Sequence, residues 1–463
     1  MEPSGDTPGR LLTAAVDARN VLVRDFDRSY RLAERAEGIY VWDDTGKRYI
    51  DGAGGVSAVV SIGHGVPEIA EVMAKQARKL AYAPMHMFLH QPVIELSELV
   101  AGLTPGSLNQ VWLVSGGSEA TENAVKLARQ YQLERGHAQK SLVISRWESF
   151  HGATLGALGY GGHTARRRNY LPLLENSPHI PPAYRYRCEF CRDRSNCTLQ
   201  CANALEHEIR RQGGENVAAF IAEPVVGAAL AAVPAPPGYF ELMREICDRY
   251  EVLLIVDEVM TGFGRTGKNF GIDHWNVEPD LIATAKGMSG GYVPLGAVIA
   301  RDEIVDVLRR NRSNFVAGHT YVGNPLAAAV GTAVIRYLLA HNLIENARVQ
   351  GERLYQALQD MRLRHPIIGD VRGKGLLVGL EFVRDLDTRE PFPSEAGIAG
   401  RIAEAALEEG LITYPLQGCV HGVDGDMIKL SPPLCITASE VDELVGLLDT
   451  AIDRVGRELR LSP

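Results

Sequence analysis

The sequence has little of several features that would place it in a specialised class of protein. No stretch approaches the roughly 18 uninterrupted apolar residues that a membrane-spanning helix requires, so we expect no membrane partner. Positive charge is not in excess: the formal net charge is -9 at pH 7, which argues against a nucleic-acid partner. Seven cysteines in 463 residues are too few for a disulfide scaffold.

The first ten residues, MEPSGDTPGR, lack the charged and then apolar pattern of a secretory signal. We interpret them as a short disordered lead-in and expect a cytoplasmic protein with reduced thiols. The composition itself is ordinary for a globular chain, with 46% hydrophobic and 23% charged residues. The length suits two or more structural domains around a large core.

The middle of the chain, from about residue 110 to residue 300, alternates short apolar runs with helical patterns. The runs read VWLV, LVIS, AAFIA, VLLIV, LIATA and LGAVIA. This alternation predicts βαβ units and a mainly parallel sheet with helices on both faces. Before it, GIYVWDDTGKRYIDGAGG predicts a β-hairpin, and the chain after about residue 343 predicts a smaller α+β unit.

Ligands of parallel sheets bind beyond the carboxyl ends of the strands, so the residues that follow each apolar run are candidates for a site. After VWLV, Gly117 permits a tight turn and Ser118 is a candidate helix N-cap. Such a turn offers free N–H groups to a phosphate, although an ordinary capped turn has the same pattern. The turn is neither a G-x-G-x-x-G fingerprint nor a P-loop, which disfavours a nucleotide.

Candidate ligand-binding residues also follow four of the other apolar runs. Phe150 and His151 follow LVIS beside a glycine, which suggests a stacking surface for a flat ligand, although a packed core aromatic has the same pattern. Glu223 follows AAFIA, Asp257 follows VLLIV, and Lys286 follows LIATA. Charged groups at such places are costly unless a partner or ligand uses them.

Together these strand ends predict one cofactor. A lysine amine forms a Schiff base with an aldehyde once desolvation lowers its pKa. A phosphate cradle, an aromatic platform, a buried carboxylate and a lysine are the groups that hold pyridoxal phosphate, whose ring nitrogen is kept protonated by an acid.

The sequence resembles the class III (omega-) aminotransferases among the fold-type-I pyridoxal phosphate enzymes, from about Gly38 to Leu447. The motifs that carry the resemblance are VWDDTGKRYIDG, SGGSEATENAVKLARQY, FHGAT, AEPVVG, VDEVMTGFGRTG, TAKGMSGGYVPLGAV, GHTYVGNPLAAA, VRGKGLLVGLEF and LSPPL. The resemblance implies an α/β PLP-transferase fold. Its large domain, with the mainly parallel sheet, would span residues 76–340. A smaller α+β domain would be built from both termini, residues 1–75 and 341–463.

The resemblance also implies a role for each site residue. Lys286 matches the lysine of the internal aldimine, which also shuttles the proton, and Asp257 matches the partner of the pyridine nitrogen. Thr320 matches a threonine that reaches the phosphate of the neighbouring subunit, which implies a homodimer with composite sites. The cofactor-binding residues implied are Gly117, Ser118, Phe150, His151, Glu223, Asp257, Val259, Lys286 and Thr320.

The activity implied is a ping-pong transamination from an amine or ω-amino acid to a keto acid, with a pyruvate-like acceptor. A lyase, racemase or aminomutase on the same scaffold is an alternative, and a non-enzymatic zinc-bearing nucleic-acid or scaffold module is another. Ala228 stands where ornithine- and 4-aminobutyrate-type members have a glutamate, and the chain has no arginine between Leu411 and Leu434 to bind a carboxylate. Arg372, Arg265 or another basic residue would have to replace it, or the natural amine has no carboxylate.

Four cysteines form a separate feature of the sequence. Cys188, Cys191, Cys197 and Cys201 follow the spacing C-x2-C-x5-C-x3-C. This spacing is compatible with a compact structural zinc site near the pocket entrance, and equally with a loop of reduced thiols.

Overall fold

The computed structural model describes residues 20–191 and 197–461, and the lead-in expected at residues 1–10 lies outside them. Seven strands form the largest sheet, in the order β4-β12-β11-β10-β7-β5-β6. Their bounds are β4 Leu108–Val114, β5 Leu142–Arg146, β6 His179–Ile180, β7 Val217–Ala222, β10 Leu253–Asp257, β11 Leu281–Thr284 and β12 Gly296–Arg301. Only β12 runs antiparallel to its neighbours. The mainly parallel sheet is confirmed, and each of the six apolar runs overlaps one strand.

Helices cover both faces of this sheet, as the continuous apolar runs predict. The helices are α1 Pro67–Lys79, α2 Gln91–Ala101, α3 Gly117–Glu134, α4 Leu155–Tyr160, α5 Thr164–Arg167, α6 Gln200–Gln212, α7 Tyr239–Arg249, α8 Asp302–Arg310, α9 Pro325–Ala340, α10 Leu343–Arg362, α11 Ile398–Glu409 and α12 Ala438–Leu461. On one face, Leu253 and Ile255 of β10 pack with α3 and α8. On the other face, Leu254 and Val256 pack with α2, α6, α7 and α9. Alternate side chains of one strand thus enter two separate cores.

Two smaller four-stranded sheets accompany the large one, and the first of them contains strands from both the N-terminal and the C-terminal part of the chain. One has the order β1-β2-β3-β15 and the other β13-β14-β17-β16, with a separate pair β8-β9. Their bounds are β1 Ala33–Glu37, β2 Tyr40–Asp43, β3 Arg48–Asp51, β8 Val225–Val226, β9 Val233–Pro234, β13 Ile368–Lys374, β14 Leu377–Phe382, β15 Leu411–Ile412, β16 Tyr414–Val420 and β17 Asp424–Leu430. The antiparallel pair β2-β3 confirms the predicted hairpin.

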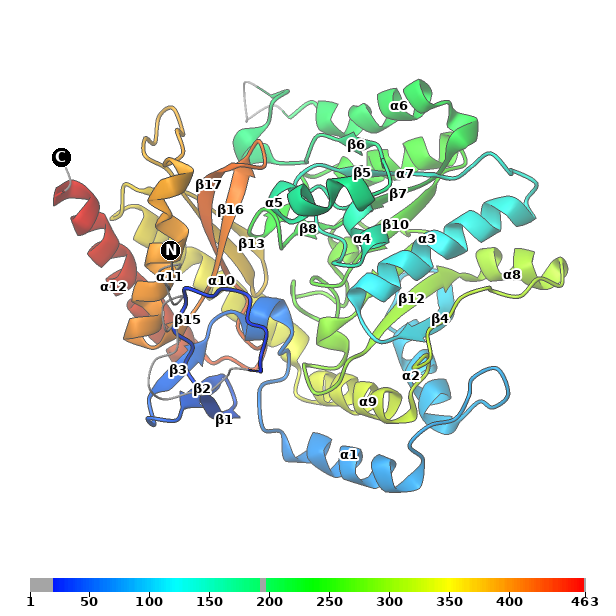
Figure 1. The fold of residues 1–463 in the computed structure, drawn as a ribbon, viewed down its shortest axis with the longest axis horizontal. Helices are drawn as coiled ribbons and strands as arrows, with labels where there is room; N and C mark the ends of the chain where they lie inside the picture. Colours follow the sequence, from blue (N-terminus) through cyan, green and yellow to red (C-terminus); the bar gives the residue numbers. More distant parts are fainter. Residues whose placement is uncertain (1–19, 192–196, 462–463) are drawn as a thin grey trace, which may run out of the picture.

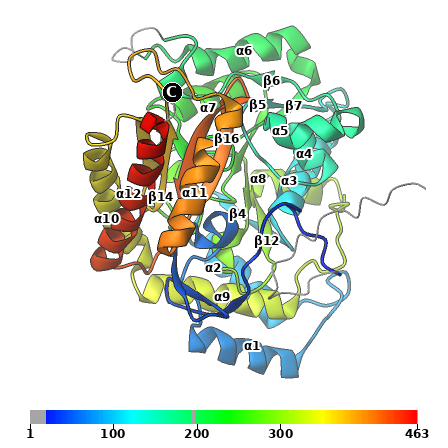
Figure 2. The same cartoon turned by 60° about the vertical axis from the view of Figure 1, so that its left-hand side comes forward.

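Strand β15 runs parallel to β3 and so attaches the N-terminal hairpin to the C-terminal part of the chain. Figures 1 and 2 show the blue N-terminal strands beside the orange and red helices α11 and α12, away from the green strands of the large sheet. The fold is the α/β fold that the sequence predicts. The domain boundaries at residues 75 and 340 stay a prediction.

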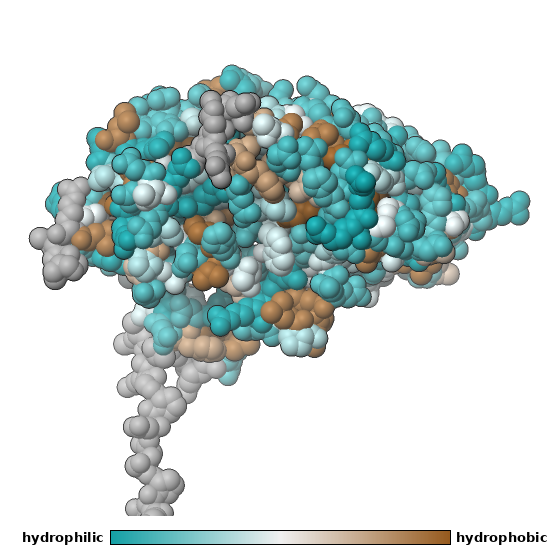
Figure 3. Space-filling model, turned by 90° about the horizontal axis from the view of Figure 1, so that it is seen from above, coloured by the Kyte–Doolittle hydropathy of each residue, from teal (hydrophilic) through white to brown (hydrophobic). Residues whose placement is uncertain are grey.

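The hydropathy of one face of the molecule and of the described helices bears on contact with a membrane. Figure 3 shows a mostly hydrophilic face with separate brown patches of hydrophobic side chains. Within residues 20–191 and 197–461, no single helix has the length and apolar character to cross a bilayer. The pair α9 and α10, bent by 62° at the break between them, meets that test only when taken together.

A close approach at Gly379 in β14 yields a stability prediction. A Cβ added to Gly379 would lie 1.8 Å from the carbonyl oxygen of Ala231, which is backbone and cannot swing aside. We expect Gly379→Ala to lower the free energy of unfolding by about 3 kcal/mol in urea denaturation. The control is Gly446→Ala on the exposed side of α12, where an added Cβ meets nothing within 4 Å. It should raise that free energy by about 0.5–1 kcal/mol, and similar effects in both variants would contradict the close approach.

Candidate active site

A cavity of 150 Å³ lies where the strands of the large sheet end. Its lining comes from the segments that follow β4, β5, β7, β10 and β11. The lining residues are Gly117, Ser118, Phe150, His151, Gly152, Glu223, Val225, Asp257, Val259, Met260 and Lys286. The structure thus brings together every cofactor-site residue predicted from the sequence except Thr320. We call this space the lysine cavity.

Lys286 follows β11 and begins a short 3-10 turn, Lys286–Met288. Its backbone φ is 43°, a left-handed value that is strained for a residue with a side chain and that occurs preferentially at functional sites. Burial lowers the pKa of Lys286 to about 8, although the carboxylates of Asp257 and Glu223 act in the opposite direction. About a tenth to a fifth of the amine is therefore neutral near physiological pH, against about 0.1% or less for an ordinary lysine, and the neutral form is the one that acts as nucleophile or base.

Asp257 is held by two partners on opposite sides of its carboxylate. Its Oδ2 lies 2.7 Å from His151 Nδ1, and its Oδ1 accepts a hydrogen bond of 3.0 Å from the backbone N–H of Val259. Both Asp257 and His151 are almost fully buried, at 3% and 2% exposure. The other ring nitrogen of His151, Nε2, is buried without a hydrogen-bond partner among the described residues. This pair fixes an acid at the base of the lysine cavity.

Glu223 holds the backbone that carries Phe150. Its carboxylate accepts a hydrogen bond of 3.0 Å from the N–H of Phe150 and one of 3.1 Å from the N–H of Gly227. Burial raises the pKa of this carboxyl above its ordinary value. Glu223 therefore links the loop after β5 to the loop after β7 and positions the Phe150 ring at the cavity.

The N-terminus of α3 forms a narrow cradle at the lysine cavity. The helix begins at Gly117, so the expectation that Ser118 caps it is wrong: Gly116 occupies the N-cap position. The Ser118 hydroxyl instead accepts a hydrogen bond of 3.0 Å from the N–H of Ala153. A Cβ at Gly117 would lie 2.8 Å from the Val259 side chain, so only glycine leaves room here. The first N–H groups of a helix have no partner within it and suit a phosphate.

Thr320 lies apart from these residues. It is exposed and does not line the lysine cavity. Its carbonyl oxygen accepts a hydrogen bond of 2.7 Å from the hydroxyl of Tyr82. The role predicted for Thr320 requires a second subunit and stays a prediction.

Comparison with known proteins identifies the family. The class-III aminotransferase family matches residues 23–452. The chain is a class-III aminotransferase. Enzymes of this family depend on pyridoxal phosphate, and the alternative of a non-enzymatic scaffold module is therefore wrong.

The relatives of this aminotransferase include proteins with assigned substrates. It is 38% identical to the uncharacterized aminotransferase YodT of Bacillus subtilis, over 94% of this chain and 98% of that protein. It is 36% identical to a putrescine–pyruvate aminotransferase of Pseudomonas aeruginosa, over 92% and 91%. It is 35% identical to a taurine–pyruvate aminotransferase of Bilophila wadsworthia, over 92% and 93%.

Solved structures resemble the aminotransferase along nearly its whole length. A transaminase from a marine Virgibacillus superposes with a TM-score of 0.87 at 37% identity, over 93% of this chain and 94% of that one. An amine transaminase from an uncultivated Pseudomonas species, in the pyridoxal phosphate-bound form, gives 0.87 at 34% identity, over 98% and 99%.

Three residues that line the lysine cavity were not predicted from the sequence: Gly152, Val225 and Met260. All three lie inside motifs quoted above: Gly152 and Met260 directly follow the selected residues His151 and Val259, and Val225 lies two residues after Glu223. Gly152 is the one with a readable signal, since its φ of 146° is accessible mainly to glycine. Val225 and Met260 are apolar residues whose patterns give no sign of a cavity.

Neither arginine offered as a substitute carboxylate ligand is free. Arg265 is buried and donates hydrogen bonds to the carbonyl oxygens of Leu376, Pro432 and Val60. Arg372 forms ion pairs with Glu381 at 2.7 Å and Asp370 at 3.0 Å.

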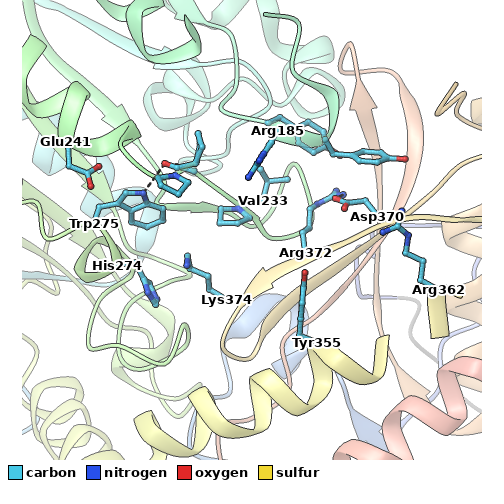
Figure 4. A pocket seen from close by; sticks show the side chains of 16 residues that line it. Arg185, Val233, Glu241, His274, Trp275, Tyr355, Arg362, Asp370, Arg372 and Lys374 are labelled. Carbon is cyan, nitrogen blue, oxygen red and sulfur yellow. Dashed lines mark hydrogen bonds and ion pairs between the residues drawn. The ribbon is translucent and has the colours of Figure 1, made fainter. Parts of the chain in front are cut away.

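Figure 4 shows Arg372 beside Asp370 at a separate cavity of 640 Å³, which is also lined by Trp275 and Lys374. The lysine cavity and this larger one share no lining residue. Arg265 and Arg372 are therefore excluded as carboxylate ligands.

The zinc site predicted at Cys188, Cys191, Cys197 and Cys201 is not supported. In the part of the chain that the structure describes, no group of three or more His, Cys, Asp or Glu side chains is arranged to hold a metal ion. Cys201 is buried at the start of α6, and burial raises the pKa of its thiol to about 12. The spacing of the four cysteines therefore does not by itself establish a zinc site.

The lowered pKa of Lys286 is testable in cofactor-free protein. Only the neutral amine reacts with acetic anhydride, so acetylation of Lys286 should rise with a midpoint near pH 8. An ordinary lysine has a pKa of about 10.4 and should still be mostly protected there. Peptide mass spectrometry gives the acetylated fraction at each pH, and exposed Lys126 on α3 is the internal control. A midpoint for Lys286 equal to that of Lys126 would show that burial does not act on the amine.

Proposed function

We propose that the chain is a pyridoxal phosphate-dependent transaminase that moves an amino group from an amine or ω-amino acid to a pyruvate-like keto acid in two half-reactions. The observation that carries this proposal is the lysine cavity, in which a partly neutral Lys286 lies near a buried Asp257. The substrate class is supported by the putrescine–pyruvate and taurine–pyruvate relatives.

The residues present fit the cofactor at each of its functional groups. The N-terminus of α3 at Gly117 and Ser118 would hold the phosphate through backbone N–H groups. Phe150 and Val259 line the lysine cavity and would hold the two faces of the flat ring. Asp257 would hold the proton on the ring nitrogen, since His151 and the Val259 N–H fix its carboxylate in place.

The chemistry requires one base and one electron sink. When bound, pyridoxal phosphate supplies the sink that absorbs the electron pair left at the substrate Cα. Lys286 Nζ would remove the proton from that Cα and hold it until it is returned, and its lowered pKa suits this work near neutral pH.

We also propose a homodimer in which Thr320 reaches the partner's phosphate site. Support comes from apolar side chains that are exposed on the segments around it. They are Tyr82, Met87, Phe88, Leu89, Val316 and Tyr321. Exposed apolar groups gathered in this way are typical of a protein interface. A cytoplasmic location stays a prediction.

The first test of the function replaces Lys286. Lys286→Ala should abolish transamination, because a general base alone contributes about 10²- to 10⁴-fold to the rate. The measurement is formation of pyridoxamine phosphate and of the keto product from an amine panel, with pyruvate or 2-oxoglutarate as acceptor. Lys126→Ala, which removes an exposed lysine from α3, should leave the rate unchanged. Turnover of Lys286→Ala within about tenfold of wild type would rule out the assignment.

The second test replaces Asp257. In Asp257→Asn the amide retains the size of the side chain but cannot stabilise a protonated ring nitrogen, so the rate should fall by about 10²- to 10³-fold while cofactor still binds. Absorbance of bound cofactor and single-turnover rates separate these two effects. Asp306→Asn, on the exposed side of α8, is the matched control. A nearly normal rate in Asp257→Asn would show that another group protonates the ring.

A further inference from the structure

A buried lysine beside the lysine cavity has no carboxylate partner. Lys429 in β17 is 0% exposed. Its Nζ donates a hydrogen bond of 2.5 Å to the hydroxyl of Ser57 and lies 4.3 Å from the centre of the Tyr414 ring. Within residues 20–191 and 197–461 it forms no ion pair. Burial lowers the pKa of Lys429 well below its ordinary value; the nearby Lys286 acts in the same direction and the Glu223 carboxylate in the opposite one. A buried amine with no anion beside it loses its proton, and an anion bound there would restore its positive charge.

A second cationic side chain, from a different element, also contacts Tyr414. Arg166 in α5 donates a hydrogen bond of 3.1 Å to the Tyr414 hydroxyl, and its guanidinium carbon lies 4.6 Å from the centre of the Phe150 ring. In the same described ranges the Arg166 guanidinium forms no ion pair. Tyr414 therefore contacts both cations, Lys429 through its ring and Arg166 through its hydroxyl.

This pair of cations lies at the edge of the lysine cavity. Phe150, under the Arg166 guanidinium, lines that cavity. Ser57, which accepts from Lys429, has its hydroxyl 3.6 Å from the sulfur of Met260, another lining residue. The charge of Arg166 also helps to lower the pKa of Lys286, so all three cations lie within electrostatic range.

The ligand that fits is a small carboxylate on the substrate itself. Guanidinium groups bind carboxylates through two parallel hydrogen bonds, and an ammonium group adds charge. The α-carboxylate of a 2-oxo acid is bonded directly to the carbon that receives the amino group. Anchoring it beside Phe150 and Met260 therefore keeps that carbon close to Lys286. A carboxylate further along a chain would place the reacting carbon away from the lysine.

Resting on the proposed transaminase function, we propose that Arg166 and Lys429 form the binding site for the α-carboxylate of the keto acid acceptor, with Ser57 and Tyr414 orienting them. Amine donors without a carboxylate do not use this pair. These two residues take the role of the carboxylate-binding arginine that the sequence lacks between Leu411 and Leu434.

The test separates the two half-reactions in the cofactor-loaded enzyme. Arg166→Gln and Lys429→Met should each raise the pyruvate concentration needed for half-maximal rate by about 10- to 100-fold, the range expected for loss of a charge-assisted hydrogen bond. The half-reaction with butylamine, which has no carboxylate, should change by less than about threefold. Arg168→Gln on the exposed surface and Lys374→Met at the separate cavity are the matched controls and should change neither half-reaction.

Equilibrium binding tests the site without turnover. Calorimetry of the loaded enzyme with propionate should show weaker binding in Arg166→Gln and Lys429→Met, and no change in Arg168→Gln. If Lys429→Met does not fold, Arg166→Gln carries the test, because Arg166 is partly exposed. Equal losses in both half-reactions, or unchanged pyruvate and propionate binding, would overturn the proposal. A wild-type enzyme that makes no keto product from any amine would instead overturn the proposed function, while propionate binding would still decide the carboxylate site.

Discussion

Burial of the Lys286 amine near the carboxylates of Asp257 and Glu223 is the interaction on which the rest of the site depends. Burial favours the neutral amine and the two acids favour the charged one, and the balance gives a pKa of about 8. A more exposed lysine would be almost fully protonated at neutral pH and a poor base. The fold sustains this balance because the parallel strands deliver all three residues to the same edge of one sheet.

The carboxylates are themselves held by backbone and side-chain partners. Asp257 is fixed by His151 and by the N–H of Val259, and Glu223 by the N–H groups of Phe150 and Gly227. These bonds join loops that follow different strands, so each acid also sets the position of an aromatic or apolar side chain at the cavity. A site assembled in this way is rigid before any ligand enters, which lowers the cost of organising it during the reaction.

The buried and partly buried cations outside the lysine cavity differ in their partners. Arg265 and Arg372 are buried and fully engaged, one by carbonyl oxygens and the other by Glu381 and Asp370. Among the described residues, the side-chain partners found for Lys429 and Arg166 are hydroxyl groups and aromatic rings, which suits both residues to the carboxylate role proposed for them. The contrast between engaged and unengaged cations distinguishes structural residues from residues suited to substrate recognition.

The sequence by itself determined the class of fold and most of the lysine cavity. Apolar runs are local patterns, and the residues that follow parallel strands must meet at one edge, so Lys286, Asp257, Glu223 and Phe150 were predictable from order along the chain. Local spacing was insufficient for Ser118, which lies inside the helix, and for the four cysteines, since the described residues contain no group arranged to hold a metal ion.

Only the tertiary structure decided which cations are free. Arg265, Arg372, Arg166 and Lys429 are equally charged in the sequence, and nothing in their neighbours along the chain separates them. Their difference lies in partners that are far away in the sequence: Leu376 and Glu381 for the first two, Tyr414 and Ser57 for the others. Spacing predicts contacts within an element or at a shared sheet edge, whereas the partners of a long charged side chain depend on how separate elements pack.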